Sequence, residues 1–430
     1  MFEKYDAYKD SGVEWIGNIP AKWSLKKISH IFRNIGSGTT PLSGSDIYYK
    51  NGYINWLQTG DLNDGYIDET SKKITEKALR HYSTLKQYPK GSLVVAMYGA
   101  TIGKVGILNI DTATNQACCV LGANLGVNIK YYFYMFQGFK ADIIRMAYGG
   151  GQPNISQDTI KKLRLPFPDL STQHEISKFL DQKTTEIDQA IAIKEQQIAL
   201  LNERKQIVIQ KAVTQGLDPN VPMKDSGVEW IGQMPEHWDI ERLGTMLEPV
   251  SKKGNLDKSL LSITREKGVI LRDVEDDSEN HNFIPDDLSN YKLIEKGQFG
   301  MNKMKAWQGS YGVSPYTGIV SPAYYVFKFI KPIHPEFFHW AIRSKLYVSF
   351  FGSASDGVRI GQWDLSKDRM KKIPFIYPSL AEQEKIVEYL EIQMSLIAKG
   401  IQLYTVEIIK LKEYKTTLIN DAVTGKIKVA

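Results

Sequence analysis

The segment KDSGVEWIG occurs at residues 9–17 of this 430-residue chain and occurs again, unchanged, at residues 224–232. Nine identical residues in a row are not expected by chance, so the segment marks an internal repeat. The units of a solenoid are about 20–50 residues long. The two copies lie 215 residues apart (224 minus 9), which indicates a duplicated half-molecule instead. We therefore predict two related halves with the same kind of task.

Each copy of the repeat introduces a region rich in glycine, tyrosine and β-forming residues. We predict strands and helices here from β-branched or aromatic runs between turn residues and from apolar periodicity. In the first half the predicted strands are 54–62, 91–99 and 115–123, and the predicted helices are 75–83 and 127–147. In the second half the predicted strands are 259–271, 297–302 and 316–330, and the predicted helix is 335–352. Both regions end in a basic segment followed by Leu-Pro-Phe or Ile-Pro-Phe.

A long helical segment follows each region. Residues 170–215 contain neither Gly nor Pro, and apolar residues recur there in alternating steps of four and three. This spacing is typical of a coiled coil, and shifting it by 210 residues reproduces it near the C-terminus. Lysines interrupt the seam at Lys194, Lys205 and Lys415. The apolar seam residues are Leu180, Ile187, Ile191, Ile198, Leu201 and Val208 in the first helix and Leu390, Met394, Ile397, Ile401, Tyr404, Ile408, Leu411 and Leu418 in the second.

Two helices that each carry an apolar stripe bury it most simply by pairing. We predict an α+β fold in which two mixed α/β domains are separated by an antiparallel pair of long coiled-coil helices, with pseudo-twofold symmetry from the duplication. The antiparallel arrangement is favoured because it closes this symmetry. The predicted parts are a first domain with its repeat block (1–168), a central helix (169–216), a second domain with its block (217–377) and a C-terminal helix (378–430). In the alternative, each helix covers only its own domain.

Composition narrows the class of protein only slightly. The chain is 42% hydrophobic and 24% charged, as ordinary globular proteins are. Its net charge of +6 permits nucleic-acid binding without demonstrating it. No apolar run approaches the roughly 18–20 residues of a membrane span, and the N-terminus lacks an apolar leader segment, so we expect a cytoplasmic protein. The two cysteines, Cys118 and Cys119, are adjacent and are expected to pack inside a strand.

Sequence motifs for catalysis are missing. The stretch GATIGKVG at 99–106 resembles a phosphate-binding loop, but it is one residue short between its glycines and has Val105 where Ser or Thr would hold Mg²⁺. The motifs of zinc proteases, serine hydrolases, redox dithiols and amino-methyltransferases do not occur in the sequence. We therefore expect neither a catalytic centre nor a metal site in this chain.

The repeated Asp10–Gly17 segment with Pro20 and Trp23, and its copy at 225–232 with Pro235 and Trp238, resemble one family. So do the tails LPFPDLSTQHEI and IPFIYPSLAEQEKI, and the stretches TGDLNDGYI, YGATIGKVGI and GIVSPAYYVFK. Over essentially its whole length the chain is similar to the specificity subunits of Type I restriction-modification systems.

The resemblance implies two target-recognition domains held apart by antiparallel helices, each reading one half of a split, asymmetric sequence in double-stranded DNA. Two modification subunits would dock on the helices, bind S-adenosylmethionine and methylate adenine N6. Restriction (motor-nuclease) subunits, which use ATP and Mg²⁺, would join for cleavage. The specificity subunit itself would be non-catalytic and bind no cofactor, in agreement with the missing motifs.

Residues 24–164 and 239–372 share little beyond their basic tails, so the two half-sites are predicted to differ. Base contacts come from amide and basic side chains, and phosphate contacts come from lysine and arginine. The predicted base readers, in or near glycine-flanked loops, are Lys104, Gln152, Asn154, Arg265, Lys303, Lys305, Gln308, Arg359 and Gln362. The predicted phosphate binders are Lys161, Lys162, Arg164, Lys367, Arg369, Lys371 and Lys372. Within the repeat, Trp15 and Trp230 are predicted to anchor each domain to the helices.

Two other functions fit the pattern. One is a coiled-coil scaffold with two protein-binding modules and no role on DNA. The other is a complete methyltransferase with an unrecognised active site. Salt-dependent binding to duplex DNA separates the first from a recognition subunit, and methyl transfer by the isolated chain would identify the second.

Overall fold

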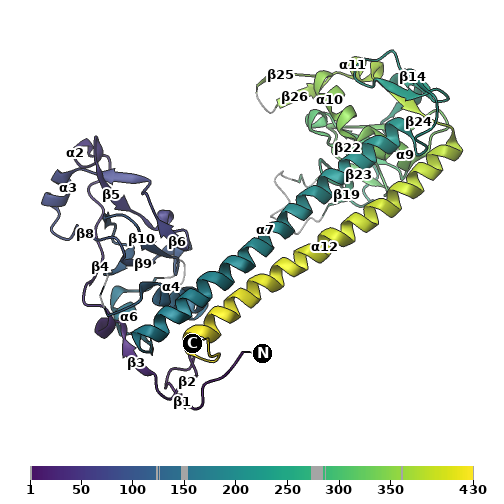
Figure 1. The fold of residues 1–430 in the computed structure, drawn as a ribbon. Coiled ribbons are helices and arrows are strands. Elements are labelled where there is room, and N and C mark those ends of the chain that lie inside the picture. Colours follow the sequence, from purple (N-terminus) through teal and green to yellow (C-terminus); the bar gives the residue numbers. More distant parts are fainter. Residues whose placement is uncertain are drawn as a thin grey trace. The chain divides into compact units, whose positions relative to one another are not determined.

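The computed structural model describes residues 2–122, 124, 126–146, 154–272, 284–285, 287–359 and 362–429. The chain forms two compact units (Figure 1). Unit 1 comprises Met1–Glu195 and Thr405–Ala430, and unit 2 comprises Gln196–Tyr404. Each unit holds one mixed α/β domain together with half of each of two long helices, α7 (Leu170–Gln215) and α12 (Leu380–Thr424).

The domain of unit 1 is built on two sheets. The first has the order β4 (Ile35–Gly36), β12 (Cys118–Leu121), β9 (Leu93–Ala96), β10 (Val105–Leu108) and β6 (Gly65–Ile67). The second has the order β7 (Lys72–Ile74), β5 (Ile54–Leu57), β11 (Thr112–Thr114) and β8 (Gln87–Tyr88). Strands β9, β10 and β12 are completely buried, as their continuous apolar runs require. Burial raises the pKa of the Cys119 thiol to about 12, so this cysteine is an inert core residue.

The helices of unit 1 surround these sheets. They are α1 (Ile28–Ile31), α2 (Asp46–Tyr49), α3 (Glu76–His81), α4 (Ile129–Gly138), α5 (Lys140–Arg145) and α6 (Gln157–Lys162). The single helix predicted over 127–147 is wrong, because it is divided after Gly138. A β-carbon on Gly138 would lie 2.2 Å from Oδ1 of Asn420 in α12. The chain therefore turns where its backbone meets the long helix.

The domain of unit 2 is built on an antiparallel sheet of β17 (Leu247–Val250), β24 (Tyr324–Phe329), β21 (Phe299–Asn302) and β22 (Tyr311–Val313). Three hairpins or strand pairs complete it: β18 (Leu261–Thr264) with β19 (Gly268–Leu271), β20 (Lys292–Ile294) with β23 (Gly318–Val320), and β25 (Ser355–Arg359) with β26 (Gln362–Leu365). Its helices are α8 (Leu243–Met246), α9 (Pro335–Ile342), α10 (Lys345–Ser353) and α11 (Lys367–Lys372).

Three predictions for unit 2 are wrong in the same way. The strand predicted over 259–271 is the β18–β19 hairpin, whose turn leads into Gly268 with a φ of +73°. The strand predicted over 316–330 is divided into β23 and β24 by a turn at 322–323. The helix predicted over 335–352 is divided into α9 and α10, and Ser344 precedes the second of them. In each place a turn interrupts an apolar pattern that is otherwise continuous.

The two long helices run antiparallel within each unit (Figure 1). In unit 1 the ammonium of Lys415 lies 2.7 Å from the Asp188 carboxylate, and that of Lys194 lies 2.6 Å from Glu407. In unit 2, Leu201 packs against Gly400. Residue numbers thus fall along α12 as they rise along α7. The predicted fold class, two mixed domains with antiparallel long helices, is confirmed.

The apolar seam residues are buried or half-buried along both helices. The fully buried ones are Leu180, Ile187, Ile191, Leu390, Ile397, Ile408 and Leu418, and the half-buried ones are Ile198, Leu201, Val208, Met394, Ile401, Tyr404 and Leu411. The seam lysines Lys194 and Lys415 form the two interhelical ion pairs of unit 1 described above.

The repeated segments form hairpins of the same shape. They are β1 (Tyr8–Asp10) with β2 (Asn18–Pro20), and β14 (Met223–Asp225) with β15 (Gln233–Pro235). In each hairpin the Asp carboxylate accepts a hydrogen bond from the glycine N–H two residues on, at 2.9 Å. Each glycine has a φ near +70°, which other residues rarely adopt. These local requirements explain why the segment is the same in both halves.

The two tryptophans of each repeat block contact different parts of their unit. Trp15 packs edge-on against Phe139, with ring centroids 4.7 Å apart, and Trp230 packs against Tyr347 at 5.6 Å. These partners belong to the domains rather than to the long helices. Contact with the long helices is made by the second tryptophan of each block. Trp23 lies against Gly425 just beyond α12, and Trp238 donates a hydrogen bond from Nε1 to Oε1 of Glu382 in α12.

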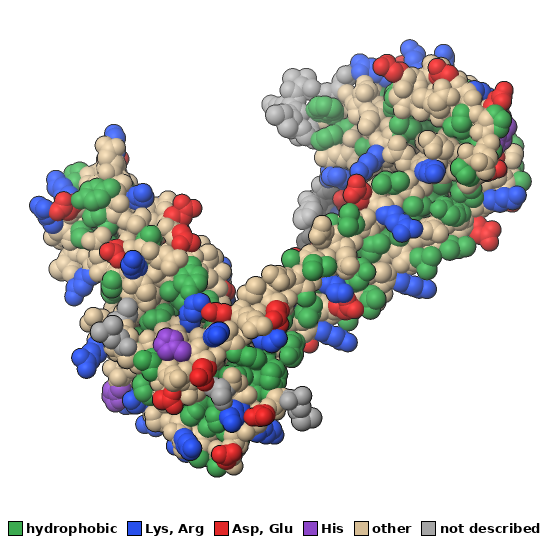
Figure 2. Space-filling view, in the orientation of Figure 1, with side chains coloured by type: hydrophobic (Ala, Val, Ile, Leu, Met, Phe, Trp, Pro, Cys, Tyr) green, Lys and Arg blue, Asp and Glu red, His purple; other side chains and the backbone are tan. Residues whose placement is uncertain are grey.

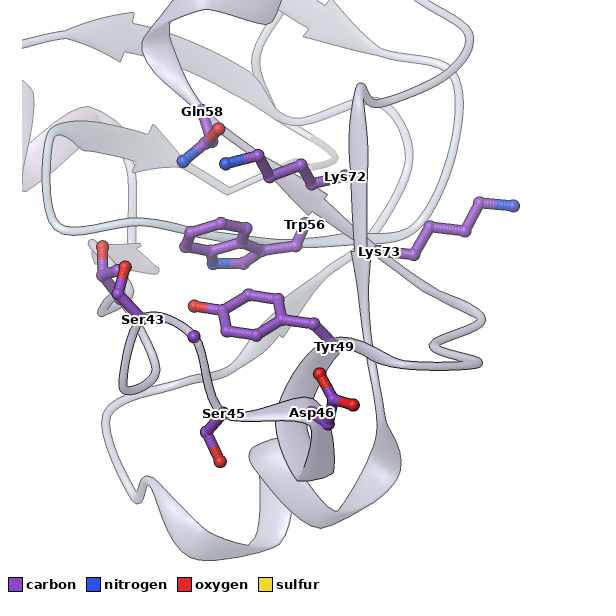
Figure 3. A pocket seen from close by; sticks show the side chains of 10 residues that line it. Ser43, Ser45, Asp46, Tyr49, Trp56, Gln58, Lys72 and Lys73 are labelled. Atoms are coloured by element: carbon purple, nitrogen blue, oxygen red, sulfur yellow. The ribbon is translucent and has the colours of Figure 1, made fainter.

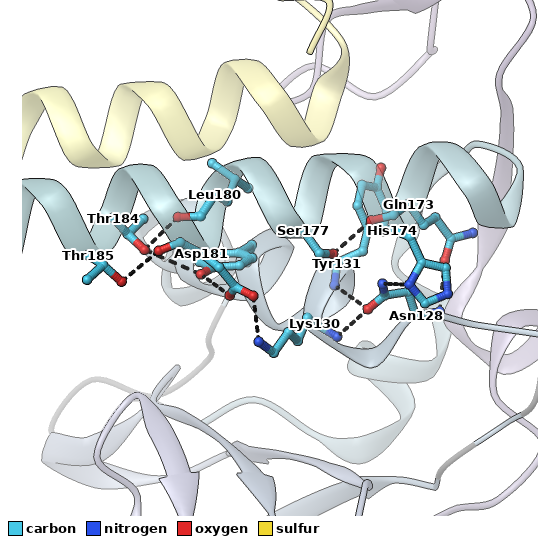
Figure 4. Close-up of polar contacts among 11 residues, drawn as sticks. Asn128, Lys130, Tyr131, Gln173, His174, Ser177, Leu180, Asp181, Thr184 and Thr185 are labelled. Carbon is cyan, nitrogen blue, oxygen red and sulfur yellow. Dashed lines mark hydrogen bonds and ion pairs between the residues drawn. The ribbon is translucent and has the colours of Figure 1, made fainter. Parts of the chain in front are cut away.

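A buried glutamine ties each long helix to its domain, and Figure 4 shows the one in unit 1, Gln173. In unit 1, Oε1 of Gln173 accepts a hydrogen bond from the Asn128 N–H at the start of α4, and its Nε2 donates to the Pro168 carbonyl. In unit 2, Gln383 does the same with the N–H of His334 before α9 and with the carbonyl of Pro378. The frame is therefore duplicated in its hydrogen bonds as well as in its sequence.

Candidate nucleic-acid interface

A loop after the central strand of each unit carries several of the predicted base readers. In unit 1 the chain passes from β9 through a short 3-10 turn, η2 (Gly99–Thr101), into β10. In unit 2 it passes from β21 through η3 (Ala306–Gln308) into β22. The framework is the same, but the first loop is built around Gly-Ala-Thr and the second around Ala-Trp-Gln. The duplication thus presents different side chains on equivalent loops.

In unit 1 the structure brings Lys104 and Asn154 to one loop. Lys104 is half-buried at the end of the η2 loop. Asn154 is exposed and pairs through its backbone with Tyr98, the residue before η2. Gln152 lies outside the described residues. Lys140 of α5 packs its side chain against Gly103 in the same loop.

In unit 2 the η3 loop lies against the β25–β26 hairpin. The ring centroids of Trp307 and Trp363 are 5.2 Å apart, and the ring planes are tilted by 35°. The Lys303 ammonium lies 3.0 Å from the Asp364 carboxylate, and this hydrogen bond raises the pKa of Lys303. Lys305 is exposed and Gln308 is half-buried. The loop and the hairpin therefore form one polar and aromatic surface.

Two further predicted readers belong to the tip of this hairpin. Arg359 and Gln362 pair through their backbones, and their side chains lie outside the described part of the chain. Arg265 occupies a different turn, between β18 and β19, where its side chain is exposed. The Arg343 guanidinium donates to the carbonyls of Arg265 and Tyr311 and so fixes that turn to β22.

The predicted phosphate binders lie on a second duplicated feature, a short basic helix. The helices α6 and α11 are capped by Ser156 and Ser366, whose hydroxyls accept from backbone N–H groups three residues on. Lys162 and Lys367 are exposed, Lys161 is half-buried near Asp158, and the exposed Arg369 lies beside the Ser353 carbonyl. The exposed Lys371 and Lys372 end α11. Arg164 is exposed on β13 (Arg164–Phe167), opposite Lys27 of β3 (Ser24–Lys27).

Basic and acidic side chains are interspersed over both domains (Figure 2). Charge alone therefore does not identify an interface. Within the described residues there is no cluster of three or more His, Cys, Asp or Glu side chains that could hold a metal ion. No helix in that part of the chain is long and apolar enough to cross a membrane.

Comparison with known proteins shows which proteins this chain is similar to. Residues 20–203 match the family model of the Type I restriction modification DNA specificity domain. The Type I restriction enzyme MjaX specificity subunit of Methanocaldococcus jannaschii is 24% identical, over 96% of each chain. The chain is therefore similar to the Type I specificity subunits. The MjaIX specificity subunit of the same organism is 28% identical over 54% of this chain, and the EcoR124I/EcoR124II specificity subunit of Escherichia coli is 26% identical over 42%.

These last two alignments span only about half of the relatives, 53% and 43% of their lengths. Two solved structures share the fold of this chain. One, from work on complex assembly and conformational transition of the type I R-M system, covers 94% of this chain and 98% of its own, with a TM-score of 0.66 and 12% identity. The HsdS subunit from Thermoanaerobacter tengcongensis covers 95% of this chain and 98% of its own, with a TM-score of 0.54 and 12% identity.

The structure of this chain also contains candidate contacts that the sequence does not reveal. In unit 1 a recess of about 480 Å³ is floored by Trp56 and Tyr49 and edged by Gln58 and Lys72 (Figure 3). In unit 2, Lys292 lies close to Tyr325 and Lys367. The three side chains of unit 2 come from elements far apart in sequence, so no local motif identifies them as a group. The half-buried Tyr-Tyr pair in SPAYYVFK is one local signal, because aromatic side chains at a surface often contact nucleic acid.

Proposed function

We propose that this chain is the sequence-specific DNA-binding subunit of a Type I restriction-modification complex. Each domain reads one half of a bipartite, asymmetric target. One observation carries the proposal. The repeat hairpins and the buried glutamines are duplicated to the level of single hydrogen bonds, whereas the η2 and η3 loops are not. The tryptophans of the η3 loop and its hairpin have no counterpart in the Gly-Ala-Thr turn of the η2 loop. Two equal frames with unequal loops suit a target whose halves differ.

The chemistry of the loops fits duplex recognition. Amide and lysine side chains such as Gln308, Lys305 and Lys104 can donate to base edges in the major groove. Basic side chains on α6 and α11, among them Lys162 and Lys367, are exposed and can neutralise phosphates. The loops provide sequence discrimination, and the basic helices provide affinity that depends on salt.

The long helices provide the surface for two modification subunits. In unit 2 they expose Leu200 and Ile207 of α7 and Ile392, Leu396 and Leu403 of α12. In unit 1 they expose Ile193 of α7 and Val406, Ile409 and Tyr414 of α12. Exposed apolar side chains at helical spacing are typical of helix-binding surfaces. Methyl transfer with S-adenosylmethionine and cleavage driven by ATP and Mg²⁺ belong to the partner subunits, and this chain positions them on DNA.

The test is domain exchange in the assembled methyltransferase. The full chain is purified with its modification subunit, and residues 239–372 are replaced by the equivalent region of another specificity subunit. Methylation sites on genomic DNA are then mapped. Recognition by separate domains predicts that one half-site changes and the other does not. A change in both halves, or in neither, contradicts it. A protein scaffold without a DNA role would show no salt-dependent binding to duplex DNA.

A further inference from the structure

A cluster of lysines surrounds one aromatic ring in unit 2. The ring of Tyr325 in β24 has the Lys367 ammonium 4.3 Å from its centroid and the Lys292 ammonium 6.0 Å away. Lys292 also donates to the Tyr324 carbonyl at 2.7 Å, which fixes the direction of its side chain. Strand β20 and helix α11 thus each bring one ammonium group near the ring of Tyr325 in β24.

The cluster holds more positive charge than the protein neutralises. The pKa of Lys292 is lowered by burial first, and then by the nearby charges of Lys367, Lys253 and Lys303. Lys303 is paired with Asp364, and Lys253 contacts the neutral amide of Asn290 at 3.3 Å. Across the described ranges, Lys292 and Lys367 have no carboxylate partner. Like charges held together on one ring create a favourable position for an external anion.

Unit 1 lacks this arrangement. The residue of α6 that corresponds to Lys367 is Gln157 (367 minus 210). Its Oε1 accepts a hydrogen bond from the Ser37 hydroxyl at 3.2 Å, so it is engaged within the domain. The frame of the basic helix is shared between the units, but the charged cluster beside it belongs to unit 2 alone among the described residues.

We propose that Lys292 and Lys367 bind one backbone phosphate of the DNA half-site that unit 2 reads, with the ring of Tyr325 as the floor of the site. The inference rests on the proposed function and deepens it. A phosphodiester is the anion that fits, because its two free oxygens can each accept from one ammonium group. Such a contact contributes affinity and register but no base preference.

The test measures DNA binding by the full chain in complex with its modification subunit. The probe is a 40-base-pair duplex that carries the methylated target, titrated from 50 to 200 mM KCl. The variants are Lys367→Gln, Lys292→Gln and the double variant. The matched control is Lys328→Gln, since Lys328 is exposed on the same strand as Tyr325 but is paired with Glu248. Lys292→Arg retains the charge if Lys292→Gln disturbs folding.

Loss of one phosphate contact lowers the slope of log affinity against log salt by about 0.9. Over this fourfold range of salt, the affinity of the double variant should therefore fall about 3.5-fold less than that of the wild type, and each single variant should lie between the two. The control should keep the wild-type slope. Base preference, measured on single-substituted duplexes, should not change. Neutral methylphosphonate linkages, placed one at a time, should reveal one position that weakens the wild type but not the double variant.

Three results would overturn the proposal. If the wild type binds with strong salt dependence and the double variant has the same slope, the cluster does not contact phosphate, although the proposed function stands. If the variants change base preference, the lysines read bases instead. If inorganic phosphate binds the cluster, seen by ³¹P NMR, while the DNA slope is unchanged, the site serves a small anion. Absence of salt-dependent DNA binding by the wild type would instead refute the proposed function itself.

Discussion

The buried glutamines Gln173 and Gln383 occupy equivalent positions in the two units, so the same substitution can be made in each unit and the two effects compared. Their exposed fractions are 0% and 1%, and each links a backbone N–H to a proline carbonyl. We consider Gln173→Met and Gln383→Met, which keep the length of the side chain and remove both hydrogen bonds. The exposed Gln210 of α7 provides the control, Gln210→Met.

The size of the effect follows from the burial of the groups left unpaired. An unsatisfied buried polar group costs about 1–3 kcal/mol. The proline carbonyl is bonded in a fully buried position in both units, whereas the N–H partner is only partly buried and can recruit water. We therefore expect a loss of roughly 2–3 kcal/mol for each variant, and less than about 0.5 kcal/mol for the surface control.

Hydrogen exchange followed by mass spectrometry measures this loss locally. Gln173→Met should speed exchange in α4 at least about 30-fold, corresponding to about 2 kcal/mol, and leave α9 unchanged. Gln383→Met should do the reverse. Equal exchange in the wild type and both variants would refute the idea that these glutamines fasten the domains to the helices. Acceleration of both helices by one variant would refute the assignment of each glutamine to its own unit.

Three further predictions use other contacts. Gly425→Ala should destabilise unit 1 in thermal unfolding by more than the roughly 1 kcal/mol that a strained φ costs, because the new β-carbon would lie 2.4 Å from Pro20. Gly17→Ala is the control. Gly17 also has a positive φ but has open space around it, so this variant should show the cost of the strained φ alone. His339 has a pKa lowered to about 4 by burial and by Arg343, and its Nδ1 accepts from the Val313 N–H. The stability that neutral His339 contributes is full above the unfolded pKa of about 6.5 and is lost as the pH falls toward 4. His339→Gln should therefore flatten the pH dependence of the free energy of unfolding between these two pH values, as measured by denaturant titrations. Leu396→Glu, at a side chain that is 58% exposed, should weaken assembly with the modification subunit at least tenfold in analytical ultracentrifugation, while Gln182→Glu should not.

Periodic features of this protein were predictable from its sequence. The heptad spacing predicted both long helices, since a coiled coil depends on residues three and four positions apart. The repeat predicted two related halves, and its two copies form equal hairpins because their Asp-Ser-Gly turns are specified locally. The correspondence of Gln173 with Gln383 was visible in the sequence, but its cause required the structure.

Features determined by distant contacts were not predictable. The break after Gly138 depends on Asn420, and the turn at Gly268 packs against Arg343 and His339. The same holds for the candidate site. Lys104, Lys303 and Lys305 were predicted from their places in or near glycine-flanked loops. Lys292 lies in a short strand that has no such sequence feature. Only folding brings it to Tyr325 and Lys367.

The most direct test of the account is the methylome of a strain that carries this chain with its modification subunit. The account predicts one methylated motif that depends on the chain. It should have two specified half-sites of different sequence, separated by a fixed number of unspecified base pairs. A palindromic motif would contradict the assignment of one unlike domain to each half-site. A methylome that does not change when the chain is deleted would contradict its role in DNA recognition altogether.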